Sequence, residues 1–303
     1  MRVVVFGRTH QLGIAELMTG AAQLDGVKTS LVRAAYRAAD PLPPADVVIL
    51  SGIRGDTAEY LAAYRAQGTN CLVLEYPRLR LVPEQATQRV GLYPDTLQTL
   101  PLTVGNDAHA PPVFSRRKRT TIRRVLVCQQ VARDTSHDLN DTQLQRVTLH
   151  MVRMARAHFG PNVRIALRTH PTAPQAFAEA VAEADSVDNG AASNITDALQ
   201  QADAVVSYNS TVGWDAIALG VPTMYMAPED LVSWSDYGSP LSQGLRVLDA
   251  SERRLALLRA ASCEWTFSQL EAGLPLAVHL GLASWPAPQL VEAGTQPFTT
   301  TGE

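Results

Sequence analysis

Two polar corners in the second half of the chain carry side chains that bind phosphate well. The first is "RTHP", residues 168–171, where an apolar run ends in Arg168 and His170 and Pro171 follows. A guanidinium and an imidazole at the tip of a strand could both face a phosphate group. The alternative is a surface histidine that precedes a turn.

The second corner is "NSTVG", residues 209–213, which follows the apolar run 203–208. Asn209, Ser210 and Thr211 come just before a predicted helix, whose first N–H groups and dipole favour an anion. We expect Gly213 to let a ligand approach the backbone. The alternative is that Ser210 or Thr211 only caps the helix.

A third polar tip ends the predicted strand 124–131, where Gln129, Gln130, Asp134 and Ser136 lie in "CQQVARDTS". Three polar tips in one half of the chain predict a nucleotide pocket with its own phosphate-binding groups. The sequence contains no Asp-X-Asp, His-Glu-X-X-His or Cys/His cluster, so we expect no metal.

The first half alternates strands and helices, which predicts a parallel sheet covered on both faces. From 78 to 115 the periodicity fades and we expect irregular structure. The predicted strands and helices are strands 2–7, 28–33, 45–52 and 70–77 and helices 14–24 and 57–68.

The second half repeats this plan, so the predicted fold class is α/β, with two Rossmann-like domains that face a central cleft. The predicted elements are strands 124–131, 163–170, 203–209 and 222–226 and helices 141–160, 174–184, 195–202, 211–220 and 250–261. We place the domains at 1–115 and 116–250, with C-terminal helices and a tail at 251–303. In such sheets, ligands bind beyond the carboxyl ends of the strands.

The composition is that of a soluble globular protein: 303 residues, 46% apolar, 18% charged, with a net charge of −3. That charge excludes a general attraction to nucleic acid or anionic membranes. Three widely separated cysteines indicate a reducing compartment. No apolar run approaches the roughly 18 residues of a membrane span. We therefore expect a cytoplasmic protein of a bacterium or of a phage-infected host.

Four segments, in order along residues 70–226, resemble the bacterial capsular polysaccharide glycosyltransferase family that contains the β-Kdo transferases. They also resemble, more loosely, bacterial sialyltransferases with a His-Pro and a later Ser/Thr motif. Two departures are Asp215, where the family usually has Glu, and the absence of the family's Gly after Glu75. The segments are "LEYPRLR" (74–80), "VLVCQQVARDTS" (125–136), "RTHP" (168–171) and "NITDALQQADAVVSYNSTVGWDAIALGVPTMYM" (194–226).

The resemblance implies a metal-independent GT-B glycosyltransferase. Its donor would be a CMP- or UDP-linked sugar held by the second domain, and the acceptor would lie against the first domain. The nucleotide sugar would be a co-substrate, with no other cofactor. The residues expected to bind it are Gln129, Arg168, His170, Ser193, Asn209, Ser210, Thr211 and Gly213.

An acceptor hydroxyl needs a base, or the sugar needs a carboxylate partner. Asp134 matches the family's carboxylate, Glu75 ends the fourth strand of the first half, and His10 follows the first strand. The alternatives are a turn residue for Asp134, an ion-pair partner for Glu75 and a helix-start residue for His10.

The acceptor is either a glycan or a hydroxymethylated base in phage DNA. A basic run could track DNA phosphates, or it could be a solvated linker. This run contains Arg116, Arg117, Lys118 and Arg119. Two other functions are compatible with the same scaffold, an NDP-sugar 2-epimerase and a non-catalytic nucleotide- or carbohydrate-binding protein.

Overall fold

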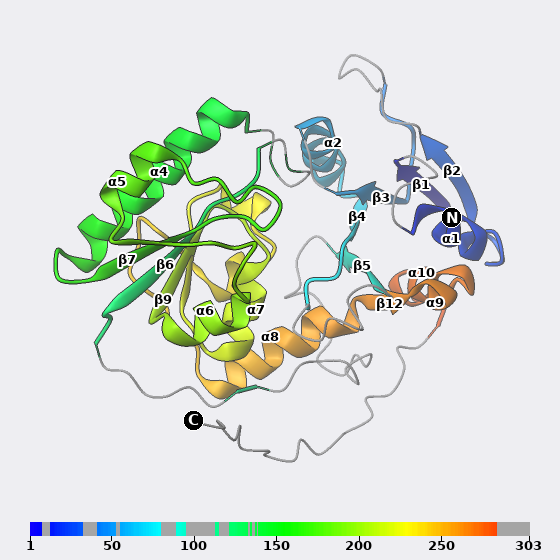
Figure 1. Ribbon diagram of the computed structural model, residues 1–303. Helices are drawn as coiled ribbons and strands as arrows, with labels where there is room; N and C mark the ends of the chain where they lie inside the picture. The colour runs from blue at the N-terminus through cyan, green and yellow to red at the C-terminus, as the bar shows by residue number, and fades with distance from the viewer. Residues whose placement is uncertain are drawn as a thin grey trace.

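Two six-stranded β-sheets form the two halves of the protein (Figure 1). We call the half built on the sheet of β1 the first domain and the half built on the sheet of β6 the second domain. The computed structural model describes residues 1–7, 13–32, 41–52, 55–79, 89–94, 113–114, 121–132, 134, 137 and 139–283.

The first sheet has the strand order β12-β5-β4-β3-β1-β2. Strands β1 to β4 are parallel, whereas β5 is antiparallel to β4 and β12 is antiparallel to β5. The β-branched run 3–5 suits a strand that is buried on both faces. The bounds are β1 (Arg2–Phe6), β2 (Lys28–Val32), β3 (Val47–Ser51), β4 (Asn70–Glu75), β5 (Arg89–Pro94) and β12 (Glu264–Thr266).

Helices cover both faces of this sheet. On one face pack α1 (Ile14–Ala21), α9 (Phe267–Glu271) and α10 (Leu274–His279), and on the other packs α2 (Gly55–Ala66). A Cβ on Gly20 in α1 would lie 2.0 Å from the carbonyl oxygen of Leu270 in α9. Only glycine permits this approach, which holds the late segment of the chain against the first domain.

The second sheet is entirely parallel, with the order β11-β10-β9-β6-β7-β8. Helices α4 and α5 pack on one face, and α6 and α7 pack on the other. The bounds are β6 (Arg124–Cys128), α4 (Asp141–Phe159), β7 (Arg164–Arg168), α5 (Ala178–Glu183), β8 (Ser186–Asp188), α6 (Ile195–Gln201), β9 (Ala204–Ser207), α7 (Val212–Leu219), β10 (Thr223–Tyr225), η3 (Glu229–Leu231), η4 (Ser235–Tyr237), β11 (Ser239–Pro240) and α8 (Ala250–Ser262).

The predicted α/β class with two Rossmann-like domains is confirmed, but two features differ from the sequence analysis. The region predicted as irregular, 78–115, contains β5, and after α8 the chain returns to the first sheet as β12, α9 and α10. Strand β12 has only three residues and pairs with β5, which in turn pairs with β4. The predicted domain boundaries stay predictions, because residues 115–120 lie outside the described part of the chain.

A buried carboxylate organises the place where the two domains meet. Glu264 is fully buried, and its Oε1 accepts hydrogen bonds from the N–H groups of Arg78 (2.7 Å) and Leu79 (2.9 Å) and from the Tyr93 hydroxyl (2.8 Å). The Arg78 guanidinium lies 3.6 Å from the centroid of the Tyr93 ring and 5.8 Å from that of Trp214 in α7. Helix α8 then links the second domain to β12 (Figure 1).

This arrangement keeps the Tyr93 phenol protonated. Burial, and then the Glu264 charge, raises the pKa of Tyr93 well above its ordinary value, so the hydroxyl remains a donor to the carboxylate. The turn that follows β4 thus contacts β12 of the first domain through Glu264 and α7 of the second domain through Trp214.

Replacing Glu264 is expected to destabilise the protein strongly. Glu264→Leu should lower the free energy of unfolding by about 3–5 kcal/mol, because it leaves two backbone N–H groups and the Tyr93 hydroxyl buried without their acceptor. Glu264→Gln keeps one acceptor oxygen and should cost about 1–2 kcal/mol. Urea unfolding at pH 7 measures both, with Glu59→Gln on the exposed side of α2 as the control. Equal stability of Glu264→Leu and the control would contradict this role.

Candidate functional site

The three polar tips of the second domain lie at one edge of its sheet. Cys128, the last residue of β6, pairs with Arg168 at the end of β7 and with Ser207 at the end of β9. The side chains that follow these strands therefore emerge at the same edge. The strands that precede His170 and Ser210 are not neighbours in the sheet, because β6 lies between them. The chain crosses from β8 to the far side of β6, which creates a topological switch point between β6 and β9.

A hydrogen bond spans this switch point. The Gln130 side chain, directly after β6, donates from Nε2 to Oδ1 of Asn209, directly after β9, at 2.8 Å. Asn209 donates in turn from Nδ2 to the carbonyl of Leu231 at 3.3 Å. Both amides are buried, so the orientation of the Asn209 side chain is fixed at the position where ligands bind in sheets of this type.

The corner of Ser210 and Thr211 begins α7, and most of its first N–H groups have local acceptors. The Ser210 hydroxyl accepts from the N–H of Val212 (3.3 Å), and the N–H groups of Gly213 and Trp214 donate to the carbonyls of Ser210 (3.2 Å) and Thr211 (3.0 Å). Ser210 therefore serves the local capping role that the sequence left open. Thr211 makes no side-chain capping bond, and its side chain is partly exposed.

The reason for glycine at position 213 differs from the prediction. A Cβ there would lie 2.1 Å from Cε2 of the Trp234 side chain, so the glycine makes room for the indole rather than for a ligand. Trp234 itself is fully buried beneath the corner.

Arg168 and Ser193 belong to a buried network of hydrogen bonds that contains an ion pair with Asp188. The guanidinium of Arg168 donates from Nη1 to Asp188 Oδ2 and to Ser193 Oγ (2.6 Å), and from Nη2 to the Ser193 carbonyl (2.7 Å). Ser193 Oγ donates to Asp188 Oδ1 at 2.6 Å. Since the carboxylate of Asp188 neutralises the charge of Arg168, the predicted phosphate contact of Arg168 is replaced by a structural role that joins β7 to β8.

His170 lies in a tight turn after β7, and its ring orientation is set by Thr172. Nδ1 lies 3.2 Å from the N–H of Thr172, which donates to it, and 2.9 Å from the Thr172 hydroxyl. In the neutral imidazole the proton is therefore assigned to Nε2. Gln129 holds the same loop, because its side chain donates to the Gln175 carbonyl (3.0 Å) and accepts from the N–H of Phe177 (3.4 Å). Gln129 thus supports the His170 loop.

Of the three predicted catalytic groups, two are described. Glu75 is the partly buried last residue of β4, three residues before Arg78, which contacts the α7 helix. Asp134 is partly buried after β6, and its carbonyl accepts from the N–H of His137 at 3.2 Å. The His137 ring packs edge-on against Tyr208, which follows β9. His10 and residues 116–119 lie outside the described part of the chain.

The described residues contain no group of three or more His, Cys, Asp or Glu side chains that could hold a metal ion. All three cysteines are buried, and burial raises the pKa of the Cys128 thiol at the end of β6 to about 12. Cys128 is therefore a protonated, weak nucleophile. None of the described helices is long and apolar enough to cross a membrane.

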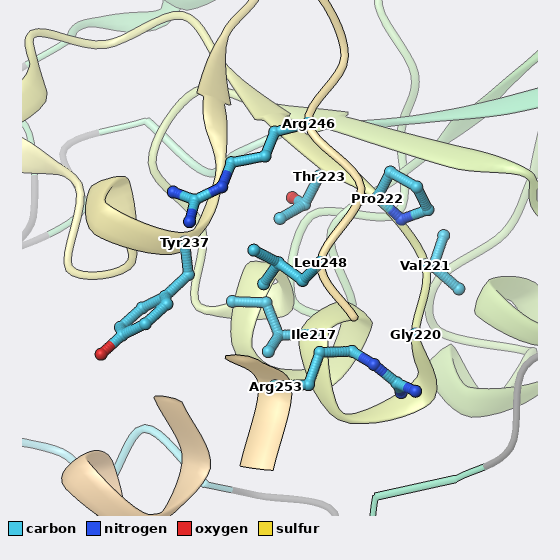
Figure 2. Close-up of a pocket in the computed structure, with 9 residues that line it drawn as sticks. All are labelled: Ile217, Gly220, Val221, Pro222, Thr223, Tyr237, Arg246, Leu248 and Arg253. Carbon is cyan, nitrogen blue, oxygen red and sulfur yellow. The ribbon is translucent and has the colours of Figure 1, made fainter. Parts of the chain in front are cut away.

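A small pocket lies at the opposite edge of the second sheet, before β10 (Figure 2). Its empty volume is about 220 Å³, including space open to solvent, and its lining is mostly apolar. The hydroxyl of Tyr237 and the guanidinium of Arg253 point away from its centre in Figure 2. Arg253 instead donates to the carbonyls of Phe114 (3.0 Å) and Ala218 (3.3 Å). This pocket therefore lies at the other end of the strands from the three polar tips.

The sequence analysis missed Asp188. Asp188 ends β8, a three-residue strand with an exposed pattern that gives no periodic signal. A signal for Asp188 was present in the sequence, since a buried strand that ends in arginine needs a carboxylate partner.

Comparison with family models and with curated proteins gives no match. Among solved structures, the chain is similar to the β-Kdo 2,7 transferase of KpsC from Thermosulfurimonas dismutans, with 15% identity, a TM-score of 0.47 and coverage of 93% of this chain and 100% of that chain. The β-Kdo 2,4 transferase of the same protein has 15% identity and a TM-score of 0.44, with coverage of 88% of this chain and 92% of that chain. A putative UDP-N-acetylglucosamine 2-epimerase from Listeria monocytogenes has 12% identity and a TM-score of 0.31, with coverage of 95% of this chain and 98% of that chain. At these values the similarities identify neither a family nor an activity.

The ion pair of Arg168 predicts a large effect of Asp188 on stability. Asp188→Asn should lower the free energy of unfolding by about 3 kcal/mol, because it leaves a buried guanidinium without its counter-charge. Glu183→Gln is the matched control, since Glu183 pairs with Arg153 and their side chains are 44% and 60% exposed. The control should cost less than about 1 kcal/mol. Denaturant unfolding measures both, and equal losses would contradict the assignment.

Proposed function

We propose that the protein is a metal-independent glycosyltransferase that moves a sugar from a CMP- or UDP-linked donor to a hydroxyl group. One observation carries the proposal. The polar ends of β6, β7 and β9 lie in register at one edge, and Arg78, in the turn after β4 of the first domain, contacts the helix that follows β9. This arrangement supports a donor site and an acceptor surface that lie next to each other.

In this proposal the donor phosphate lies over the ends of β6, β7 and β9. His170 donates to it from Nε2, and Thr211 donates from its hydroxyl, while the amino end of α7 contributes its dipole. These groups stabilise the negative charge that grows on the leaving phosphate as the bond between the anomeric carbon of the sugar and the phosphate oxygen breaks. Asn209, held by Gln130, orients the nucleotide, whereas Arg168, Ser193 and Gln129 support the loops.

The acceptor hydroxyl forms the new bond to the anomeric carbon, and its proton passes to a carboxylate. Asp134 and Glu75 are the two proposed bases, one from each domain. The motif resemblance supports Asp134, and the contact of the β4 turn with α7 supports Glu75. His10 remains a proposed third contact to donor or acceptor.

Removing the imidazole of His170 is expected to lower transfer without unfolding the protein. His170→Ala should reduce kcat about 100-fold, on the scale of one lost donor to a developing charge, while His170→Gln should keep part of the rate because its amide can donate. His150→Ala, exposed on α4, is the control. The assay follows CMP-, UDP- and GDP-sugars by mass spectrometry in EDTA, with glycans or hydroxymethylated DNA as acceptors.

The same assay separates the alternative functions. Conversion of a free nucleotide sugar to its epimer without acceptor would indicate an epimerase; because epimers have equal masses, this product is resolved by chromatography or NMR. Binding without turnover would indicate a binding protein. Either result, or full activity of His170→Ala, would contradict the proposed mechanism.

The acceptor class is tested by salt. If DNA is the acceptor, the basic run 116–119 should contact phosphates, and the logarithm of the DNA association constant should fall with the logarithm of salt concentration with a slope of about −3 to −4. Replacing Arg116 and Arg117 by Ser should reduce that slope by about 2. A slope near zero, with transfer to a glycan, would assign the acceptor to glycans.

A further inference from the structure

Arg78 carries a buried positive charge that no acidic side chain pairs with in the described part of the chain. The residue is 8% exposed, its Nε is buried without a hydrogen-bond partner, and the ion pairs of the described residues do not include it. Glu264 accepts a hydrogen bond from the backbone N–H of Arg78 and not from its guanidinium. A buried charge without a partner costs stability, so we expect it to serve a purpose other than stability.

The guanidinium lies where the two domains meet, and each side of this contact is fixed within its own domain. In the first domain, the Arg78 backbone binds Glu264 at 2.7 Å, and the guanidinium lies 3.6 Å from the centroid of the Tyr93 ring. In the second domain, the fully buried indole of Trp214 donates to Ser233 Oγ at 3.0 Å. The position of one side relative to the other therefore depends on how the guanidinium and the indole meet.

Apolar side chains surround this contact. Leu79 and Tyr93 of the first domain belong to one buried cluster with Trp214 and Ile217 of α7. Apolar packing is non-directional, whereas a cation is attracted to the face of an aromatic ring. The Arg78 guanidinium, 5.8 Å from the centroid of the Trp214 ring, thus adds a directional contact between the domains.

We infer that Arg78 is a positioning residue, whose contact with Trp214 sets the separation between Glu75 in the first domain and the corner that begins α7 in the second. Glu75 lies three residues before Arg78, and Trp214 is the third residue of α7. This inference rests on the proposed function and deepens it, because transfer needs the base and the donor at a fixed separation. In this role the guanidinium acts through Trp214 and does not touch the substrate.

The first test removes the charge and keeps the bulk of the side chain. Arg78→Met should lower kcat about tenfold or more, because a small misplacement of reacting groups is costly. The dissociation constants of CMP and UDP, measured by calorimetry in EDTA, should change less than about twofold. The melting temperature should be equal or higher, since an unpaired buried charge is removed. Arg78→Lys keeps a cation and should retain part of the rate.

Arg253→Met is the matched control, because Arg253 is 7% exposed and lies in α8. Its guanidinium donates to the carbonyls of Phe114 and Ala218, so this variant should lower the melting temperature and leave kcat unchanged. The same pattern in Arg78→Met would assign Arg78 a purely structural role and overturn the inference. A rise in the nucleotide dissociation constants with unchanged kcat would make Arg78 a ligand contact, which also overturns it.

A double-mutant cycle tests the contact itself. Trp214→Phe keeps an aromatic ring but weakens its attraction for a cation, so it should lower kcat by less than Arg78→Met does. Added to Arg78→Met, it should lower kcat no further, because the contact is already lost. Effects that multiply in the double variant would overturn the inference, also where the single variants lose stability.

Failure of the proposed function gives a different result. If the wild-type protein binds neither CMP nor UDP and transfers no sugar, the proposed function fails and the inference fails with it. If the wild type transfers a sugar and Arg78→Met does so at the same rate, only the inference fails.

Discussion

The relation between the two domains depends on the carboxylate of Glu264. It holds the turn after β4 through two backbone N–H groups and the Tyr93 hydroxyl, and this turn presents Arg78 to Trp214 in α7. Glu264 lies in β12, which belongs to the first sheet but follows the second domain and α8 in the sequence. The turn that follows β4 is thereby held against the helix that follows the Ser210 corner.

The charged side chain at the strand edge of the second domain is already paired within the protein. Arg168 is the buried cation at the strand edge in the described part of the chain, and Asp188 neutralises it. An anion at this edge would therefore meet neutral donors, namely an imidazole N–H and a hydroxyl. Fixed neutral dipoles stabilise a developing charge well when they need no reorganisation. The contacts of Gln129 and Gln130 supply that rigidity, since each holds a loop that carries one proposed donor.

Much of this could be predicted from the sequence, because it depends on local pattern. The apolar runs and their polar ends indicated the parallel strands, and the spacing of Leu144, Met151 and Ala155 indicated α4. Features that depend on distant partners could not be predicted in this way. The three residues of β12 gain their role only from β5, and Gly213 reads as a ligand contact until Trp234 is placed beside it. The strand order also escaped prediction, because His170 and Ser210 flank β6 although their strands follow one another closely in the chain.

The most direct test of the account is a crystal structure of the protein soaked separately with CMP and with UDP in the presence of EDTA. The account predicts nucleotide density beyond the carboxyl ends of β6, β7 and β9, with a phosphate oxygen within hydrogen-bonding distance of His170 Nε2 and the Thr211 hydroxyl. Density in the pocket before β10, or no bound nucleotide at saturating concentration, would contradict it.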